Sequence, residues 1–228
     1  MATQADPTAA PRVPLSRERV LRAAVRLADE GGFESLTMRR LGQELGVQAM
    51  SLYNHVANKD DIRDGIVELV LGEIEIPSGP DWKASLRRSA ISAHDVLVRH
   101  PWASGVMHAT ARIIPARMQW MEAVLRTLRE AGFSADMTHH AYHALDSHIT
   151  GFTLWQVSFP FDTREELAEL AEGFLRQIPA DEYPYVIEHA HQHLGEPDPG
   201  EPSEFEFGLD LLLDGLERIR DAAGHAST

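Results

Sequence analysis

The stretch that most constrains the fold runs from residue 37 to residue 59 and reads TMRRLGQELGVQAMSLYNHVANK. Leu41 and Leu45 are four residues apart, so they share one face of a short helix that Thr37 can cap at its start. Gly46 follows where this helix should end, because glycine enters the left-handed backbone region without a side-chain clash. The spacing therefore predicts a short helix closed by a tight turn.

A second short helix is expected directly after this turn, over residues 48–56. Leu52 and Val56 are again four apart and point inward, while the outward positions carry hydrogen-bonding groups. Two short helices joined by a glycine turn, the second with a polar outer face, are typical of a helix-turn-helix. The polar outward residues are Gln48, Ser51, Tyr53, Asn54 and His55.

The side chains of this hairpin suit a DNA duplex. Tyr53 and Lys59 can meet phosphates, other polar groups can reach base edges in the major groove, and Ala49 and Met50 can touch thymine methyl groups. From periodicity alone, a helical hairpin of an all-α core with its polar residues facing water fits equally well. The candidate DNA-binding residues are Thr37, Arg39, Gln48, Ala49, Met50, Ser51, Tyr53, Asn54, His55 and Lys59.

The same stretch resembles the DNA-binding segment of the TetR family of transcriptional repressors. The resemblance rests on Leu36-Thr37, Leu45-Gly46-Val47, Leu52-Tyr53-Asn54-His55-Val56 and Lys59. Within that family the form Leu-Tyr-x-His-Val-x-Asn-Lys is similar to the tetracycline-repressor branch. The resemblance implies a DNA-binding regulator that responds to a small-molecule effector.

Composition narrows the class of protein. With 228 residues and 43% hydrophobic content, the chain can bury a sizeable core, and the absence of cysteine excludes disulfides and cysteine-ligated metals. No apolar run approaches the roughly 20 residues of a membrane span, and the N-terminus lacks the apolar core of a signal peptide. We therefore expect a cytoplasmic protein with no membrane partner.

The net charge of −14 is unexpected for a DNA-binding protein, but it is unevenly distributed. Of the 21 basic and 35 acidic side chains, nine of each lie in residues 1–66, which leaves 12 basic and 26 acidic groups in residues 67–228. The first part is neutral overall and locally basic at Arg39, Arg40 and Lys59. An acidic remainder can repel phosphate and orient the first part towards DNA, although it can equally serve solubility alone.

Helical periodicity continues to the end of the chain and no segment alternates with period two, which predicts an all-α protein. We expect a disordered tail over 1–14, a helix-turn-helix DNA-binding domain with a connector helix over 15–76, and a ligand-binding and dimerisation domain over 77–228. Ser16 should cap the first helix, and Pro77-Ser78-Gly79-Pro80 should end the connector. Helices in the larger domain are expected over 81–101, 102–108, 116–131, 134–159, 163–178, 183–194 and 205–222.

The last expected helix carries a broad apolar stripe, and its two glycines, Gly208 and Gly215, indicate close approach of another helix because glycine costs a helix about 1 kcal/mol. It resembles the final helix of tetracycline repressors, which implies pairing with the 134–159 helix in a four-helix interface of a homodimer. Burial of the stripe within one chain is the alternative. The stripe consists of Phe205, Leu209, Leu212, Leu213, Leu216 and Ile219.

Several histidines gather between His139 and His148, and His139 and His143 are placed four apart as a metal-chelating pair would be. No HExxH and no carboxylate at a fixed partner spacing accompanies them, so solvated or hydrogen-bonded histidines are the favoured interpretation. The alternating histidines of the HAHQH stretch are given no role. We expect no metal and no cofactor.

A small-molecule pocket is expected around His108, which precedes a non-helical break and lies near methionines and an indole. Ordinary core packing is the alternative for those apolar residues. In tetracycline repressors a histidine at this place binds the drug-chelated magnesium, which the resemblance implies for His108. Gln156 and Glu75 differ from the other two polar anchors of that family, so an unrelated organic effector is expected. The candidate ligand-binding residues are His108, Arg112, Met121, Val124, Leu125, His143, Ser147 and Gln156.

Taken together, these features predict a homodimeric repressor, not an enzyme, that a small organic effector releases from a palindromic double-stranded operator. Two other classes stay open at this point. One is a metal-dependent hydrolase that uses the His139–His148 cluster, although no nucleophile elbow, phosphate loop or zinc motif is present. The other is a helical adaptor whose hairpin binds protein.

Overall fold

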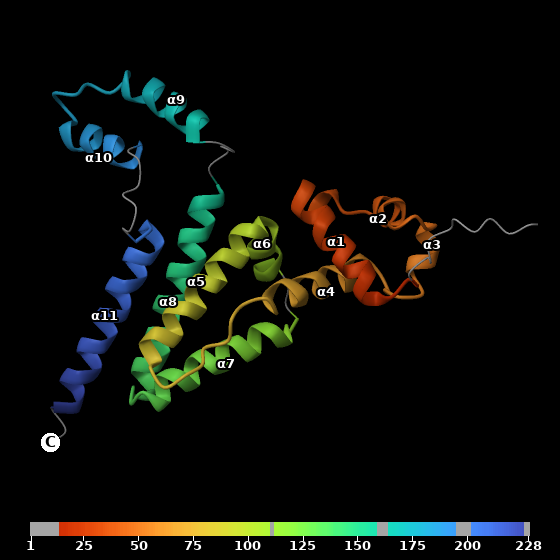
Figure 1. Cartoon of the computed structure of the whole chain (residues 1–228), viewed down its shortest axis with the longest axis horizontal. Helices are drawn as coiled ribbons and strands as arrows, with labels where there is room; N and C mark the ends of the chain where they lie inside the picture. Colours follow the sequence, from red (N-terminus) through yellow and green to blue (C-terminus); the bar gives the residue numbers. More distant parts are fainter. Residues whose placement is uncertain (1–13, 110–111, 159–163, 195–201, 226–228) are drawn as a thin grey trace, which may run out of the picture. The chain divides into compact units, whose positions relative to one another are not determined.

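A computed structural model describes residues 14–109, 112–158, 164–194 and 202–225, and every regular element in these ranges is helical (Figure 1). The all-α prediction is confirmed for this part of the chain. The helices are α1 (Arg17–Gly31), η1 (Phe33–Ser35, a 3-10 turn), α2 (Met38–Leu45), α3 (Ala49–Leu52), α4 (Lys59–Leu71), α5 (Trp82–Arg99), α6 (Pro101–Ala109), α7 (Pro115–Glu130), α8 (Ala135–Val157), α9 (Arg164–Leu175), α10 (Pro184–Leu194) and α11 (Glu204–His225).

The chain divides into two compact units, Met1–Tyr142 and His143–Thr228, and α8 runs through the boundary. The first unit holds α1 to α7, and the second holds the end of α8 together with α9, α10 and α11. None of the helices in the described ranges is both long and apolar enough to cross a membrane. The predicted disordered tail lies almost entirely outside the described residues.

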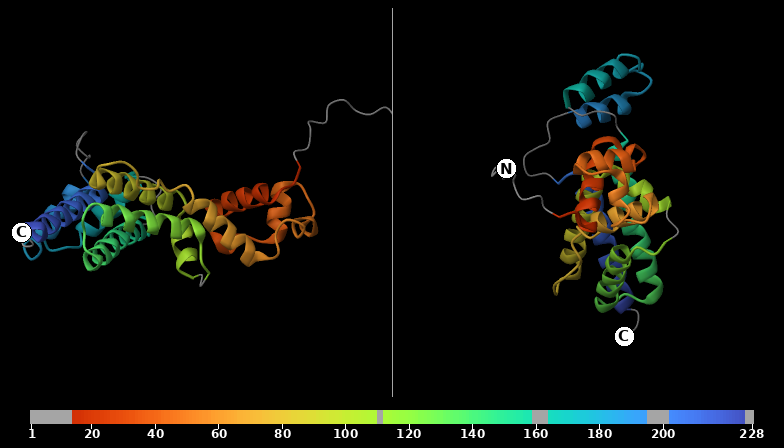
Figure 2. Two further views of the ribbon diagram at one scale, coloured as in Figure 1. Left: turned by 90° about the horizontal axis from the view of Figure 1, so that it is seen from below. Right: turned by 90° about the vertical axis from the view of Figure 1, so that its right-hand side faces the viewer.

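The first four helices enclose a core of their own, which we call the head (residues 15–71). α1 packs against α4 and α2, and α2 packs against α3, so these helices form one group, coloured red to orange in the further views (Figure 2). The predicted α1 stripe is buried at Val20, Leu21, Ala24 and Ala28, with Val25 partly buried. The other fully buried members of the core are Ala23, Leu27, Leu36, Leu41, Leu52, Val56, Ile62 and Ile66.

Side-chain caps fix where the helices of the head begin. Ser16 accepts the backbone N–H of Arg19, and Thr37 accepts that of Arg40, at 3.2 and 3.1 Å. Both caps were predicted from the sequence, and each contributes on the order of 1 kcal/mol. Asn58 caps α4 in the same way, its Oδ1 accepting an N–H at 2.8 Å.

The connector helix is shorter than predicted, because α4 ends at Leu71 and not at residue 76. Beyond Gly72 the chain forms turns, and the backbone of Glu75 is then hydrogen-bonded to two hydroxyl groups of α5. Ser89 donates to the Glu75 carbonyl at 2.6 Å, and the Glu75 N–H donates to Ser92 at 2.9 Å. These bonds to a neighbouring helix replace the helical bonds that periodicity alone would have continued.

The rest of the first unit packs on α4. α5, α6 and α7 all contact it, and the Trp120 indole N–H of α7 donates to the buried Ser89 hydroxyl at 2.9 Å. The ring of Trp82 meets Phe133 edge to face, with centroids 5.1 Å apart. This layer holds the far side of α4, so the connector lies between the head core and these helices.

In the second unit α11 packs against the end of α8. The His148 ring stacks on Phe205 with centroids 4.9 Å apart, and its Nε2 lies 3.0 Å from the Phe205 carbonyl oxygen. A Cβ on Gly208 would lie 2.7 Å from the same imidazole, so a neighbouring helix of the same chain approaches closely at Gly208. Phe205, Leu209, Leu213 and Leu216 of the predicted stripe are buried within this chain, which was the alternative to a dimer interface for them. Gly215 has no atom within 4 Å of a Cβ position, and its face is open among the described residues.

Candidate nucleic-acid interface

The turn between α2 and α3 depends on two glycines. Gly46 has φ 67° and ψ 32°, the left-handed geometry predicted for it, and it ends α2. Gly42 was not singled out from the sequence. A Cβ there would lie 2.9 Å from the carbonyl oxygen of Val47 and 3.2 Å from the amide of Ala49. Glycine at residue 42 therefore lets α3 start directly against α2, and a glycine inside an otherwise regular helix was the available signal.

The segment from Gln48 to Val56, which we call the recognition segment, contains less helix than predicted. Only Ala49–Leu52 is α-helical, and the chain then turns through His55. The amides of His55 and Val56 both donate to the carbonyl of Leu52, at 2.9 and 3.0 Å. Leu52 and Val56 are buried as predicted, so the inward side of the segment is anchored in the head core.

The outward side of the recognition segment is accessible. Met50 exposes 73% of its surface and Tyr53 exposes 47%, and Gln48 and Asn54 are exposed as well. The remaining predicted DNA-binding residues, Thr37, Arg39, Ala49, Ser51, His55 and Lys59, are exposed or partly buried, and none is buried. The structure thus brings the ten predicted residues to the surface of a single hairpin and the start of α4.

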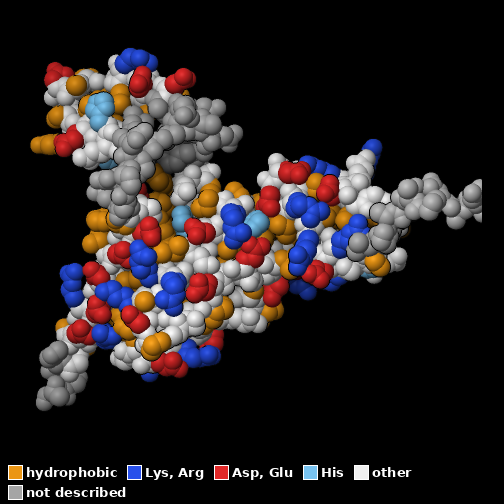
Figure 3. Space-filling model, in the orientation of Figure 1, with side chains coloured by type: hydrophobic (Ala, Val, Ile, Leu, Met, Phe, Trp, Pro, Cys, Tyr) orange, Lys and Arg blue, Asp and Glu red, His pale blue; other side chains and the backbone are white. Residues whose placement is uncertain are grey.

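Two of the basic side chains near the hairpin are held by neighbouring groups. The Lys59 Nζ lies 4.9 Å from the centre of the Phe33 ring, a cation–π contact that fixes where its charge sits. Arg40 donates to Ser35 at 2.9 Å and pairs with Glu30 at 3.4 Å. On the visible face of the head, basic side chains alternate with acidic ones (Figure 3).

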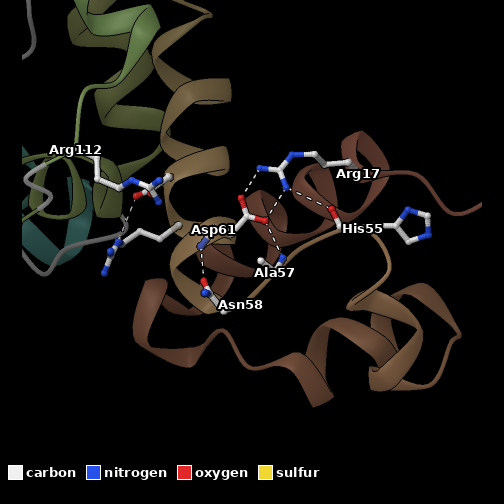
Figure 4. A network of polar contacts seen from close by, with 8 residues as sticks. Arg17, His55, Ala57, Asn58, Asp61 and Arg112 are labelled. Atoms are coloured by element: carbon white, nitrogen blue, oxygen red, sulfur yellow. Dashed lines mark hydrogen bonds and ion pairs between the residues drawn. The ribbon is translucent and has the colours of Figure 1, made fainter.

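The end of the recognition segment meets α1 and α4 in a polar network (Figure 4). Arg17 donates to Asp61 through its two terminal guanidinium nitrogens, Nη1 and Nη2, at 2.8 and 2.7 Å, and its Nη1 also donates to the His55 carbonyl at 3.3 Å. Asp61 accepts the Ala57 N–H at 2.8 Å. The hydrogen bonds from Arg17 hold the pKa of the Asp61 carboxyl below its ordinary value of 3.8, with smaller help from the Ala57 N–H and partial opposition from burial.

Polar contacts also tie the head to the junction of α5 with α6 and to the residues before α7 in the same unit. Asp29 of α1 lies 2.7 Å from His100 Nδ1 and accepts the Trp102 indole N–H at 2.7 Å. On α4, Asp64 pairs with Arg112 at 2.8 Å. These contacts join residues 48 to 73 positions apart, so no sequence motif indicated them.

The α4 connector also contacts the start of α7. Both carboxylate oxygens of Glu68 accept the backbone N–H of Ala116, at 3.2 and 3.1 Å. A carboxylate at the N-terminal end of a helix is favoured by the unpaired N–H groups there. The connector is therefore bonded to the first turn of α7, four residues after the predicted ligand-binding Arg112.

The predicted ligand-binding residues fall in different environments. On α7, Val124 is buried and Met121 and Leu125 are partly buried, while Arg112 is exposed and bound to Asp64. The side chain of His108 lies outside the described residues. On α8, His143, Ser147 and Gln156 are all exposed. Their assignment to an effector site remains a prediction.

The histidines of α8 do not assemble a metal site in the described ranges. His139 and His140 are exposed, with ring centroids 5.5 Å apart. Among the residues that the structure describes, no group of three or more His, Cys, Asp or Glu side chains is placed to hold a metal ion.

Two family models cover most of the chain. Residues 20–66 match the bacterial regulatory proteins of the tetR family, and residues 76–220 match the tetracyclin repressor-like C-terminal domain. The chain belongs to the TetR family. The predicted resemblance is confirmed, and it extends through the helices of both units.

Individual relatives of this TetR-family protein agree. The tetracycline repressor protein class C of Escherichia coli is 32% identical over 210 residues, covering 90% of this chain and 92% of that protein. The transcriptional repressor DrrR1 of Streptomyces coeruleorubidus is 32% identical over 221 residues, covering 92% and 80%. The structure of Streptomyces coelicolor ActR in complex with actinorhodin superposes with a TM-score of 0.71 at 27% identity, covering 91% and 99%.

The family fixes the class of function. This protein is a TetR-family transcriptional regulator with an N-terminal helix-turn-helix, and its role is regulatory and not enzymatic. The metal-dependent hydrolase and the protein-binding adaptor are therefore set aside. The helix-turn-helix of the family model contains α2, the turn and the recognition segment, where the predicted DNA-binding residues lie.

Proposed function

We propose that this TetR-family regulator binds a near-palindromic operator as a homodimer and that a small organic effector releases it. The observation that carries the proposal is the recognition segment, whose apolar side is sunk in the head core while Gln48, Met50, Tyr53 and Asn54 face outward. A rigid hairpin with amide, phenol and thioether groups on its outer side matches what a major groove presents to a protein.

The homodimer is supported by α11. Phe207, Leu211, Gly215 and Ile219 follow one another at intervals of four residues, so they share one face of the helix. Phe207 and Leu211 each expose more than half of their surface, and the open face of Gly215 leaves room for a second backbone. A second copy of α11 with the same face supplies a self-complementary surface, and two-fold symmetry then presents two recognition segments to half-sites about 34–36 Å apart.

The effector is supported by the relatives and by the contacts of Arg112. ActR binds actinorhodin, and this regulator resembles it over nearly its full length. Arg112, one of the predicted ligand-binding residues, is bonded to Asp64 of α4, the helix that follows the recognition segment after a short turn. A ligand that repositions the segment around Arg112 would shift α4, and a coupling of about 1–3 kcal/mol lowers operator affinity about 5–150-fold.

The operator is tested by selection from a pool of random-sequence duplexes with the full-length protein, followed by mobility-shift titration of the enriched duplex. We expect one near-palindromic motif, bound as a dimer, with an affinity that falls steeply with salt. Failure of the selection to enrich any motif at low salt would contradict the proposal. The enriched duplex is called the selected duplex below.

The effector is tested by release of the protein from the selected duplex with aromatic compounds, actinorhodin among them. Tetracycline with magnesium is the control, and it should release the protein poorly because Glu75 and Gln156 stand where the tetracycline-repressor resemblance implies other polar anchors. Release by tetracycline with magnesium at low concentration would overturn this part of the proposal.

A further inference from the structure

The recognition segment is too short to hold its own shape. α3 has four residues, and a single helical turn fixes several backbone dihedrals in return for very few hydrogen bonds, so it does not form stably alone. Its conformation in the protein must come from what surrounds it. The inward side is held by the burial of Leu52 and Val56, and the amides of His55 and Val56 bind the Leu52 carbonyl. This leaves the His55 carbonyl and the N–H of Ala57, the residue just after the segment, to be fixed by other contacts.

Arg17 and Asp61 provide those contacts (Figure 4). Arg17 donates to the carbonyl of His55, and Asp61 accepts the N–H of Ala57, so the pair binds the backbone on both sides of Val56. Both groups lie in the turn between α3 and α4, outside the hydrogen-bond ladder of either helix, so side chains must supply their partners. The two side chains also bind each other through two parallel charge-assisted bonds, an arrangement that fixes orientation as well as distance.

The anchor points of this pair lie in the two longest helices of the head. Arg17 is the first residue of α1, and Asp61 lies in the first turn of α4, where Asn58 Oδ1 accepts its N–H at 2.8 Å. One turn further along α4, a Cβ on Gly65 would lie 2.8 Å from Leu21 and 3.4 Å from the Arg17 guanidinium. The glycine therefore allows α1 to approach α4 closely at the level where the pair forms.

We propose that Arg17 and Asp61 are positioning residues for operator recognition: they set the angle at which the recognition segment leaves the head, without contacting DNA themselves. This inference rests on the proposed function and deepens it. Two other roles are possible for the same residues, a direct phosphate contact by Arg17 and a contribution to folding alone, and each predicts a different result.

The experiment compares Arg17→Ala, Arg17→Lys and Asp61→Asn in the full-length dimer, at a temperature where circular dichroism shows each variant fully folded. Affinity is measured for the selected duplex and for an unrelated duplex of equal length, over a range of salt concentrations. The matched control is Arg22→Ala, which removes an exposed ion pair of the same length, 2.7 Å to Glu18, on the same helix.

A positioning role predicts that Asp61→Asn and Arg17→Ala weaken binding to the selected duplex by up to about fivefold, because a partly exposed ion pair can bias the orientation of the segment by no more than its own modest energy. Binding to the unrelated duplex should be unchanged, and so should the slope of log affinity against log salt. Arg17→Lys should resemble Arg17→Ala, because a lysine cannot make the two parallel bonds. The double variant Arg17→Ala/Asp61→Asn should lose no more than the single ones, and Arg22→Ala should behave as wild type.

Other outcomes overturn the inference. A phosphate contact by Arg17 would weaken both duplexes alike and reduce the salt slope by about 0.9. A role in folding alone would leave the ratio of the two affinities unchanged in every folded variant. If Arg17→Ala does not fold, the affinities of the near-isosteric Asp61→Asn variant distinguish these roles. The proposed function itself fails in a different way, namely if the wild-type protein shows no preference for any duplex.

Discussion

The head and the second unit differ in where their large apolar side chains are exposed to solvent. In residues 15–71 the large apolar side chains that are exposed are Met50 and Tyr53, and both lie on the recognition segment. In the second unit such side chains are exposed on α9, α10 and α11 alike, with Phe207 and Leu211 among them. The head therefore exposes large apolar side chains only on the recognition segment, whereas the second unit exposes them on several helices, where a further protein surface can cover them.

The largest effect is expected when a charged side chain is introduced into the apolar surface of α11. Leu211→Arg should convert the protein to a monomer, because it places a charge in the middle of the exposed face of α11. Affinity for the selected duplex should fall about 100-fold or more, since two linked half-site contacts become one. Sedimentation velocity and mobility shift measure the two effects.

The control for this variant is Ile113→Arg, which changes an equally apolar and even more exposed residue before α7. It should remain dimeric and bind normally. A Leu211→Arg protein that stays dimeric would show that α11 does not form the interface.

The tight packing of α2 against α3 in the head is tested by substituting Gly42. Gly42→Ala puts a methyl group 2.9 Å from the backbone oxygen of Val47, which cannot move without opening the turn. We expect a loss of about 1–3 kcal/mol in the free energy of unfolding, as for other overpacked sites. Gly105→Ala on α6, where the space is open, should be neutral or stabilising by up to about 1 kcal/mol. Urea unfolding decides, and equal stability of the two variants would contradict the tight α2–α3 approach.

Within the head, Asn54 and Lys59 should separate base reading from phosphate binding. Asn54→Ala should cost about 1–3 kcal/mol for the selected duplex and relax the preference at one base-pair position. Lys59→Ala should weaken all duplexes alike and lower the salt slope by about one. Titrations against single-base variants of the selected duplex, at several salt concentrations, distinguish them. The same behaviour from both variants would show that one of the roles is wrongly assigned.

The smallest effect is a pH dependence of stability in the head. The pKa of Asp61 is lowered on folding, so the charged carboxylate stabilises the native state above the unfolded value near 3.8, and this contribution is lost as pH falls through the lower folded value. Because both partners are partly solvent-exposed, we expect less than about 1 kcal/mol. The difference in unfolding free energy between wild type and Asp61→Asn should be constant from pH 7 to 5 and shrink towards pH 3. A difference that does not change with pH would contradict the ion pair.

Local rules were enough for much of the head. Ser16, Thr37 and Gly46 act through backbone groups at most a few residues away, so their roles follow from their positions relative to the apolar spacing. The end of α4 is different. Apolar spacing continues to Ile74, but the hydroxyls of Ser89 and Ser92 bind the backbone of Glu75, and nothing in the spacing encodes which later helix supplies them.

The same division applies to the sites. The outward residues of the recognition segment were predictable, because a helical face repeats every three or four residues. The bonds of Arg17 to Asp61 and of Asp29 to His100 span 44 and 71 residues, so they exist only once the helices are packed. The predicted effector residues, from His108 to Gln156, also come from separate segments, and they stand as predictions.

The brevity of α3 has a consequence for how such a regulator acquires new target genes. A side chain such as Met50, with 73% of its surface exposed on a turn whose shape is imposed from behind, adds almost nothing to the stability of the protein. Under the proposed function, a substitution at such a position changes which base pairs are contacted while the fold of the head stays intact. Duplicated copies of this gene should be able to drift towards different promoters through a few surface changes, with no need for compensating changes in the interior.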